Sequence, residues 1–157
     1  MFPVGFRVDF EGHEIIDYPA ELDLGSYGIE IVESGVRNLV RVLWSRLHYK
    51  TVCACAGHED NLPFPWMVVL INAAPELEKL ARAIARFNTS LGNNSHPPRV
   101  DQTWVLLPLV NANSGFAIYI QPADINNTCS TARISELRKS ADALAEFLET
   151  KCADIFE

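Results

Sequence analysis

The sequence predicts an α+β protein in which a largely antiparallel sheet is packed with helices. Two observations carry this prediction. Apolar residues recur at helical spacing in three segments, 34–47, 75–87 and 135–155. Short apolar or alternating segments, typical of strands, lie in pairs between these helices and before the first of them. The expected order of elements is therefore (ββ)-αββαββα.

The length and composition predict one domain. The chain has 157 residues, of which 48% are hydrophobic and 21% charged, values typical of an ordinary globular protein. We expect a single domain over 1–157. Within it, an N-terminal hairpin and irregular segment (1–33) precede an αββαββα core (34–157).

The first elements are an expected hairpin. Apolar and polar residues alternate over 6–10, the period of a half-buried strand. Residues 11–12 are typical of a turn, and 14–18 of a return strand. The mixed segment 19–33 receives no assignment.

The clearest helix covers 34–47, and Ser34 stands where an N-cap side chain accepts main-chain N–H bonds. In the strand expected at 51–56, residues alternate so that Thr51 shares one face with Cys53 and Cys55. An uninterrupted apolar run, WMVVLI, follows at 66–71. Such a run is typical of a strand covered on both faces, and we expect it to pair antiparallel with 51–56.

The second half repeats this pattern. Pro75 suits the first turn of a helix, and the strands on either side of 111–115 have the signal of a hairpin. Pro108 predicts that the first of these strands is an edge strand or carries a bulge. The last helix is expected from about 135, with Cys152 on its apolar stripe.

Charge and hydropathy restrict the partners. A net charge of −7 disfavours nucleic acid, whose phosphates normally require a basic surface. The basic residues Arg37, Arg41 and Arg46 are expected on a solvated helix face. No leader-like segment and no charge-free apolar run of about 18 residues occur. We expect a soluble cytoplasmic protein with reduced cysteines, no membrane association, and a small molecule or further copies of itself as partners.

The stretch TVCACAGHED (51–60) is the candidate site. Cys53, Cys55 and His58 are residue types that bind zinc. Side chains two apart on a strand are separated by about 6.5–7 Å, whereas two thiolates on one zinc lie about 4 Å apart. Both cysteines can therefore ligate only if the strand bends at Gly57 or at a bulge, and Cys55 with His58 is the easier pair. Candidates for a fourth ligand are Glu59, Asp60 and His48.

Other interpretations of this stretch remain open. In a catalytic pocket, Cys55 would be the nucleophile and His58 the base, with Gly57, Glu59 and Asp60 at the rim. Alternatively, the cysteines are small buried residues and the HED segment is a polar loop tip. The protein would then be a non-catalytic one that associates through a strand edge or an apolar patch.

The order of elements around TVCACAGH resembles that of the tRNA methyltransferase family of wybutosine synthesis. That family has a Thr-Ser-Ser-Cys-Ser-Gly-Arg strand between a helix and an apolar strand introduced by a Pro-aromatic segment. Thr51, Cys55 and Gly57 match it, and PWMVV (65–69) looks like the following strand. Two alanines replace serines, and His58 replaces the arginine. The resemblance implies S-adenosylmethionine as cofactor and tRNA as partner.

Overall fold

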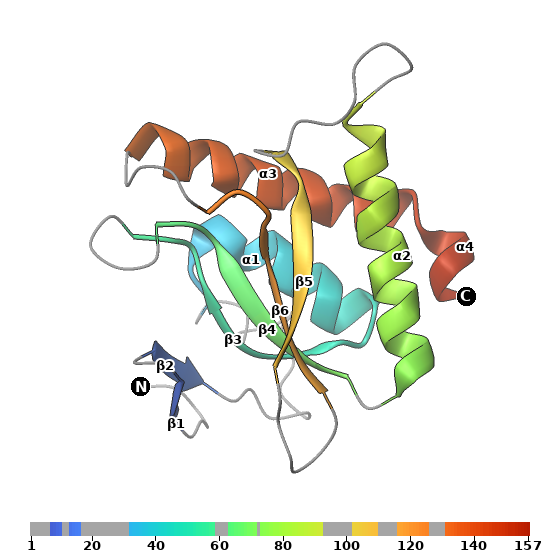
Figure 1. Cartoon of the computed structure of the whole chain (residues 1–157), viewed down its shortest axis with the longest axis horizontal. Coiled ribbons are helices and arrows are strands. Elements are labelled where there is room, and N and C mark those ends of the chain that lie inside the picture. Colours follow the sequence, from blue (N-terminus) through green and yellow to red (C-terminus); the bar gives the residue numbers. More distant parts are fainter. Residues whose placement is uncertain are drawn as a thin grey trace.

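A computed structural model of the protein confirms the α+β class (Figure 1). The structure describes residues 7–10, 13–16, 32–58, 63–71, 73–92, 102–109, 116–125 and 131–157. Its elements follow the expected order. They are β1 (Arg7–Phe10), β2 (His13–Ile16), α1 (Ser34–Arg41), the π-helix η2 (Val42–Arg46), β3 (Lys50–Cys55), β4 (Trp66–Ile71), α2 (Ala74–Ser90), β5 (Trp104–Leu109), β6 (Phe116–Pro122), α3 (Thr131–Thr150) and α4 (Ala153–Phe156).

Four strands form an antiparallel sheet in the order β3-β4-β6-β5, and β1 and β2 form a separate antiparallel pair. β5 is thus an edge strand, as Pro108 predicted, because proline cannot donate to a further neighbour. The expected hairpin residues 111–115 lie outside the described residues.

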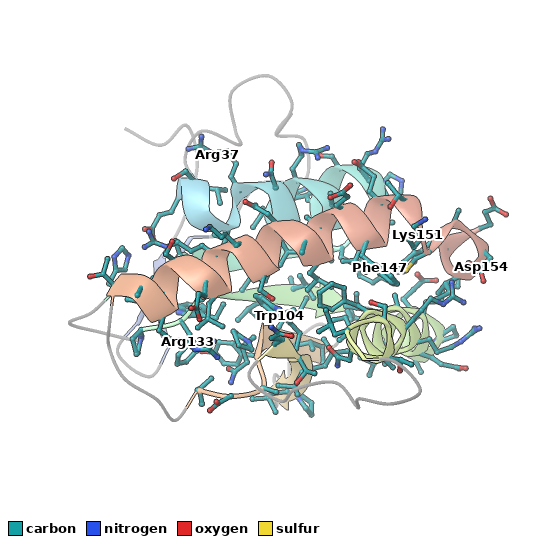
Figure 2. All side chains as sticks on the ribbon, turned by 90° about the horizontal axis from the view of Figure 1, so that it is seen from above. Arg37, Trp104, Arg133, Phe147, Lys151 and Asp154 are labelled. Atoms are coloured by element: carbon teal, nitrogen blue, oxygen red, sulfur yellow. The ribbon has the colours of Figure 1, made fainter. Side chains whose placement is uncertain are left out.

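The helices cover one face of the sheet. In Figure 1, α1 and α3 lie together behind the strands, and α2 runs along the β5 side. Alternate residues of β4, Met67, Val69 and Ile71, point into the core that these helices form. Figure 2 shows Phe147 of α3 next to α2, where its ring meets Phe87 edge to face with centroids 5.4 Å apart. Trp104 is anchored from the sheet side, because its indole N–H donates to Ser140 of α3 at 2.9 Å.

The residues on the other face of β4 pack into a second apolar cluster. Trp66 and Val68 are 3% and 2% exposed and lie with Phe64, Ala117 and Leu137. β4 is therefore buried on both faces, as its continuous apolar sequence predicted.

A bulge in β3 changes which face its residues occupy. The pairing with β4 shifts between Thr51 and Cys53. Thr51 pairs with Val69 on the helix side and is fully buried, whereas Cys55 pairs with Trp66 and packs against the second cluster. The expected sharing of one face by Thr51 and Cys55 is wrong, because one inserted residue reverses the alternation.

Two helices differ from their expected extents. The helix expected at 34–47 becomes a π-helix at Val42 that ends at Arg46, and His48, two residues further on, has a φ of 64° in the left-handed region. The last helix begins at Thr131 rather than near 135 and stops at Thr150, so that the buried Cys152 lies between α3 and α4. Helical spacing alone does not reveal this break, because the apolar stripe continues across it.

The three arginines of α1 and η2 contact neighbouring segments. Arg37 donates to the carbonyl of Val32, while Arg41 and Arg46 form ion pairs with Glu149 of α3. Within the described ranges, no helix is both long and apolar enough to cross a membrane.

Candidate metal and ligand site

The N-terminal end of α1, the end of β3 and the first half of α3 meet in one place (Figure 1). Three side chains converge there. They are Glu33, Cys55 and His58. Each offers one ligand atom, and these atoms all lie within 4.8 Å of one another. The imidazole Nε2 of His58 is 2.9 Å from Oε2 and 3.2 Å from Oε1 of Glu33. A carboxylate thus orients the imidazole beside a thiol.

Gly57 provides the turn that places His58 next to Cys55. Its φ of +87° lies in the left-handed region, and a β-carbon there would be 2.8 Å from the main-chain carbon of Phe64. Only glycine fits without strain at such a position. The Gly57 N–H donates to the sulfur of Cys55 at 3.4 Å, which holds the turn against the end of β3.

Glu33 faces the site instead of capping its helix. It occupies the N-cap position of α1, but its side chain makes no cap hydrogen bond. Its Oε1 instead accepts the N–H of Ala56 at 3.5 Å, and the carboxylate contacts His58. The expected N-cap role of Ser34 is wrong, because Ser34 is already the first helical residue.

Arg138 of α3 holds the turn from the opposite side. Its Nε donates to the carbonyl of Ala56 at 2.9 Å, and its Nη2 donates to the carbonyl of Gly57 at 2.7 Å. These bonds connect α3 to the two residues between Cys55 and His58. A cavity of about 360 Å³ opens beside them. It is lined by Gly57, His58, Thr131, Ile134, Ser135 and Arg138.

Burial keeps the Cys55 thiol protonated. It raises the pKa of Cys55 from 9.0 to about 11, and the negative charge of Glu33 acts in the same direction. The Gly57 N–H and the Arg138 charge lower the pKa but do not compensate. A bound cation would favour the thiolate, so this cluster is better suited to hold a metal than to present a thiolate on its own.

The structure brings some of the predicted site residues together. The side chains of Cys55 and His58 lie close together in space, and Gly57 forms the turn that leads from one to the other. The main chain of Cys53 pairs with Val68 of β4, and its side chain lies outside the described part of the structure. His48 lies two residues after η2 and is not part of the cluster. Glu59 and Asp60 lie outside the described residues.

Glu33 is the site residue that the sequence did not indicate. It stands 22 residues before Cys55 and belongs to no local motif with it. The available signal was an acidic side chain directly before a helix, which is usually explained by the helix dipole.

No protein-family model matches this chain, no curated protein matches its sequence, and no solved structure matches it. The resemblance to the wybutosine-synthesis methyltransferases therefore stays a prediction. Functional interpretation rests on the geometry of the residues themselves.

Proposed function

We propose that the protein binds one zinc ion through Glu33, Cys55 and His58, and uses the remaining coordination position for Lewis-acid chemistry on a small ligand. The observation that carries the proposal is the convergence of three different ligand atoms within 4.8 Å of one another. Zinc–ligand bonds of about 2.0–2.3 Å place tetrahedral ligand atoms roughly 3.3–3.8 Å apart. Because Nε2 of His58 and Oε2 of Glu33 are already 2.9 Å apart, zinc would replace the contact between them, and a small shift of the side chains would bring Cys55 onto the same ion.

The types of ligand favour zinc. A thiolate, an imidazole and a carboxylate are its three common protein ligands, and zinc accepts them in mixed sets. The charge of Glu33 raises the pKa of Cys55, because a thiolate at Cys55 would be repelled by the neighbouring carboxylate in the metal-free protein. A divalent cation between them removes that repulsion and displaces the thiol proton.

The described part of the chain supplies three ligands, a number that favours a reactive site over a structural one. Structural zinc sites usually have four protein ligands, whereas catalytic sites have three and leave a position for water or substrate. Zinc in such a position polarises a bound carbonyl or phosphoryl oxygen and lowers the pKa of bound water to about 7. The reaction class that we propose is hydrolysis of a small ligand.

Thiol catalysis is the second candidate, because Glu33 orients the imidazole of His58 beside Cys55. A nucleophile, a base and an acid that orients the base are the parts of a nucleophilic site. The raised pKa of Cys55 argues against this mechanism, since cysteine nucleophiles normally have a lowered pKa. We therefore favour zinc binding over thiol catalysis.

Metal analysis tests the proposal. Full-length protein, purified without chelator or nickel resin, is analysed for zinc and iron before and after addition of zinc. We expect about one zinc per chain in the wild type and loss of binding in Cys55→Ala and His58→Ala. Glu33→Gln should weaken binding by about 10-fold or more, because a carboxylate ligand is lost. Cobalt substitution adds a thiolate-to-metal band that requires Cys55.

Cys53→Ala is the matched control. It removes a thiol from the same strand and should leave zinc binding unchanged. Zinc binding that requires Cys53 and not Glu33 would contradict the proposed ligand set. If the wild type takes up no zinc and an iodoacetamide-sensitive activity requires both Cys55 and His58, the thiol mechanism replaces it.

A further inference from the structure

The cavity beside His58 lies between the turn after β3 and the first turns of α3. We infer that this cavity binds the anionic group of the ligand, a carboxylate or a phosphate, and that Arg138 recognises it. The inference rests on the proposed function, which supplies the zinc ion next to this cavity and the reaction that occurs there. The anion site itself is formed mainly by residues of α3, whereas none of the zinc ligands belongs to α3. The zinc site and the anion site can therefore be tested, and rejected, independently.

Arg138 has N–H groups that its own hydrogen bonds do not use, and its side chain is already held in position. A guanidinium carries five N–H groups in a planar fork. Two of its nitrogens, Nε and Nη2, donate to the carbonyls of Ala56 and Gly57. These bonds fix the plane of the guanidinium, and N–H groups remain for a ligand. Because the fork is fixed before the ligand arrives, little side-chain entropy is lost on binding.

The charge of Arg138 is not neutralised by an ion pair within the described part of the chain. Four other arginines form ion pairs with carboxylates: Arg41, Arg46, Arg86 and Arg133. The side chain of Arg138 instead donates to two neutral main-chain carbonyls. A half-buried guanidinium at a cavity wall, with carbonyls as its partners, favours an incoming anion.

The rest of the lining agrees with an anionic ligand. The described residues around the cavity include no carboxylate. Ser135 contributes a hydroxyl group, which can donate a hydrogen bond to an anionic oxygen. His58 belongs both to this lining and to the metal cluster. A ligand anchored at Arg138 would therefore extend toward the open position of the zinc ion.

Titration of two simple anions tests the inference. Inorganic phosphate and acetate are added separately to zinc-loaded and metal-free full-length protein, and binding is followed by calorimetry and by the Arg138 Nε–H signal in NMR spectra. We expect saturable binding of at least one anion and a shift of the Arg138 signal. The anion that binds more tightly distinguishes a phosphate ligand from a carboxylate ligand.

Variants separate recognition from support of the fold. Arg138→Gln should weaken anion binding by about 10-fold or more, and Arg138→Lys should restore part of it because the charge returns. Ser135→Ala should weaken it by about 2- to 5-fold. Zinc content must remain near the wild-type value in folded variants. If Arg138→Gln does not fold, the NMR titration of the wild type decides.

The outcomes differ for the two proposals. Anion binding with a shifted Arg138 signal in a protein that takes up no zinc would support the anion site and overturn the proposed function. Zinc binding without saturable binding of either anion, or anion binding that leaves the Arg138 signal unmoved, would overturn this inference and leave the zinc site standing.

Discussion

Gly35 in the first turn of α1 lies directly against Arg138 of α3. A β-carbon at position 35 would be 2.8 Å from Cδ and 2.9 Å from Nε of Arg138, and 2.8 Å from the β-carbon of Ala56. Real β-carbons do not approach other atoms so closely. The missing side chain of Gly35 therefore provides the space through which Arg138 reaches the carbonyls of Ala56 and Gly57.

Gly35→Ala is expected to destabilise the protein, although alanine is favoured over glycine within a helix by about 1 kcal/mol. The added carbon displaces Arg138 and weakens its two bonds to main-chain carbonyls. We expect the free energy of unfolding to fall by about 1–2 kcal/mol, measured by urea denaturation. In an Arg138→Ala background the same change should cost less, since one of the two contacts is gone. An equal cost in both backgrounds would assign the effect to Ala56 alone.

Most of the fold could be predicted because it depends on local periodicity. The alternating and continuous apolar segments identified the strands, and Pro108 identified an edge strand. The bulge at Thr51 and the π-helix after Arg41 were missed. The bulge and the π-helix each insert one residue into a regular backbone pattern. Such an insertion leaves no mark in the amino-acid composition of the segment, so the sequence does not reveal it.

The site was predictable only where its residues are close in sequence. Cys55, Gly57 and His58 form one strand and turn, and their proximity follows from the chain itself. Glu33 and Arg138 arrive from α1 and α3, and their positions depend on how the two helices pack over the sheet. No spacing rule connects these two residues with position 55. Their place in the site could therefore be recognised only in the structure.

His48→Gly is expected to stabilise the protein. His48 has a φ of 64° two residues after η2, and the Tyr49 N–H after it donates back to the Leu43 carbonyl at 2.7 Å. This is a helix ending of the kind that usually has glycine in the left-handed position. A non-glycine residue there costs about 1–2 kcal/mol, and the greater freedom of glycine in the unfolded chain offsets about 0.5–1 of it.

We therefore expect a gain of about 0.5–1 kcal/mol in the free energy of unfolding, measured by thermal and urea denaturation. His48→Ala is the control, because it removes the imidazole and keeps the backbone strain. A loss of stability in both variants would show that contacts of the imidazole outweigh the strain.

Thr51→Val is also expected to stabilise the protein. Thr51 is fully buried, and its hydroxyl has no hydrogen-bond partner in the structure as described. Valine has nearly the same shape, suits a strand, and removes the cost of burying an unsatisfied hydroxyl. We expect a gain of about 1 kcal/mol in the free energy of unfolding.

The control for this change is Thr51→Ser, which keeps the hydroxyl and removes a methyl group. It should lower the free energy of unfolding by about 1 kcal/mol. Destabilisation by valine would mean that the hydroxyl has a partner, and it would point to a buried water beside β3.

The pKa of Cys55 leads to a prediction for the metal-free protein. With a pKa of about 11 in place of 9.0, the thiolate fraction at pH 8 is about 100-fold smaller than that of an ordinary thiol. We expect iodoacetamide to modify Cys55 about 100-fold more slowly than a model peptide at this pH, because only the thiolate reacts. The measurement is quantitative mass spectrometry of the Cys55 peptide, and a rate equal to that of the peptide would contradict the raised pKa.

The same pKa fixes how stability and zinc affinity depend on pH. The unfolded chain loses the thiol proton near pH 9, whereas the folded protein retains it until about pH 11. Fewer protons are then bound to the unfolded state, so the contribution of Cys55 to stability is complete below pH 9 and is lost between pH 9 and 11. Zinc binding must displace this proton, and its affinity should rise about tenfold per pH unit between pH 7.5 and 9. Competition titrations with a zinc chelator at several pH values measure this slope, and an affinity independent of pH would exclude Cys55 as a ligand.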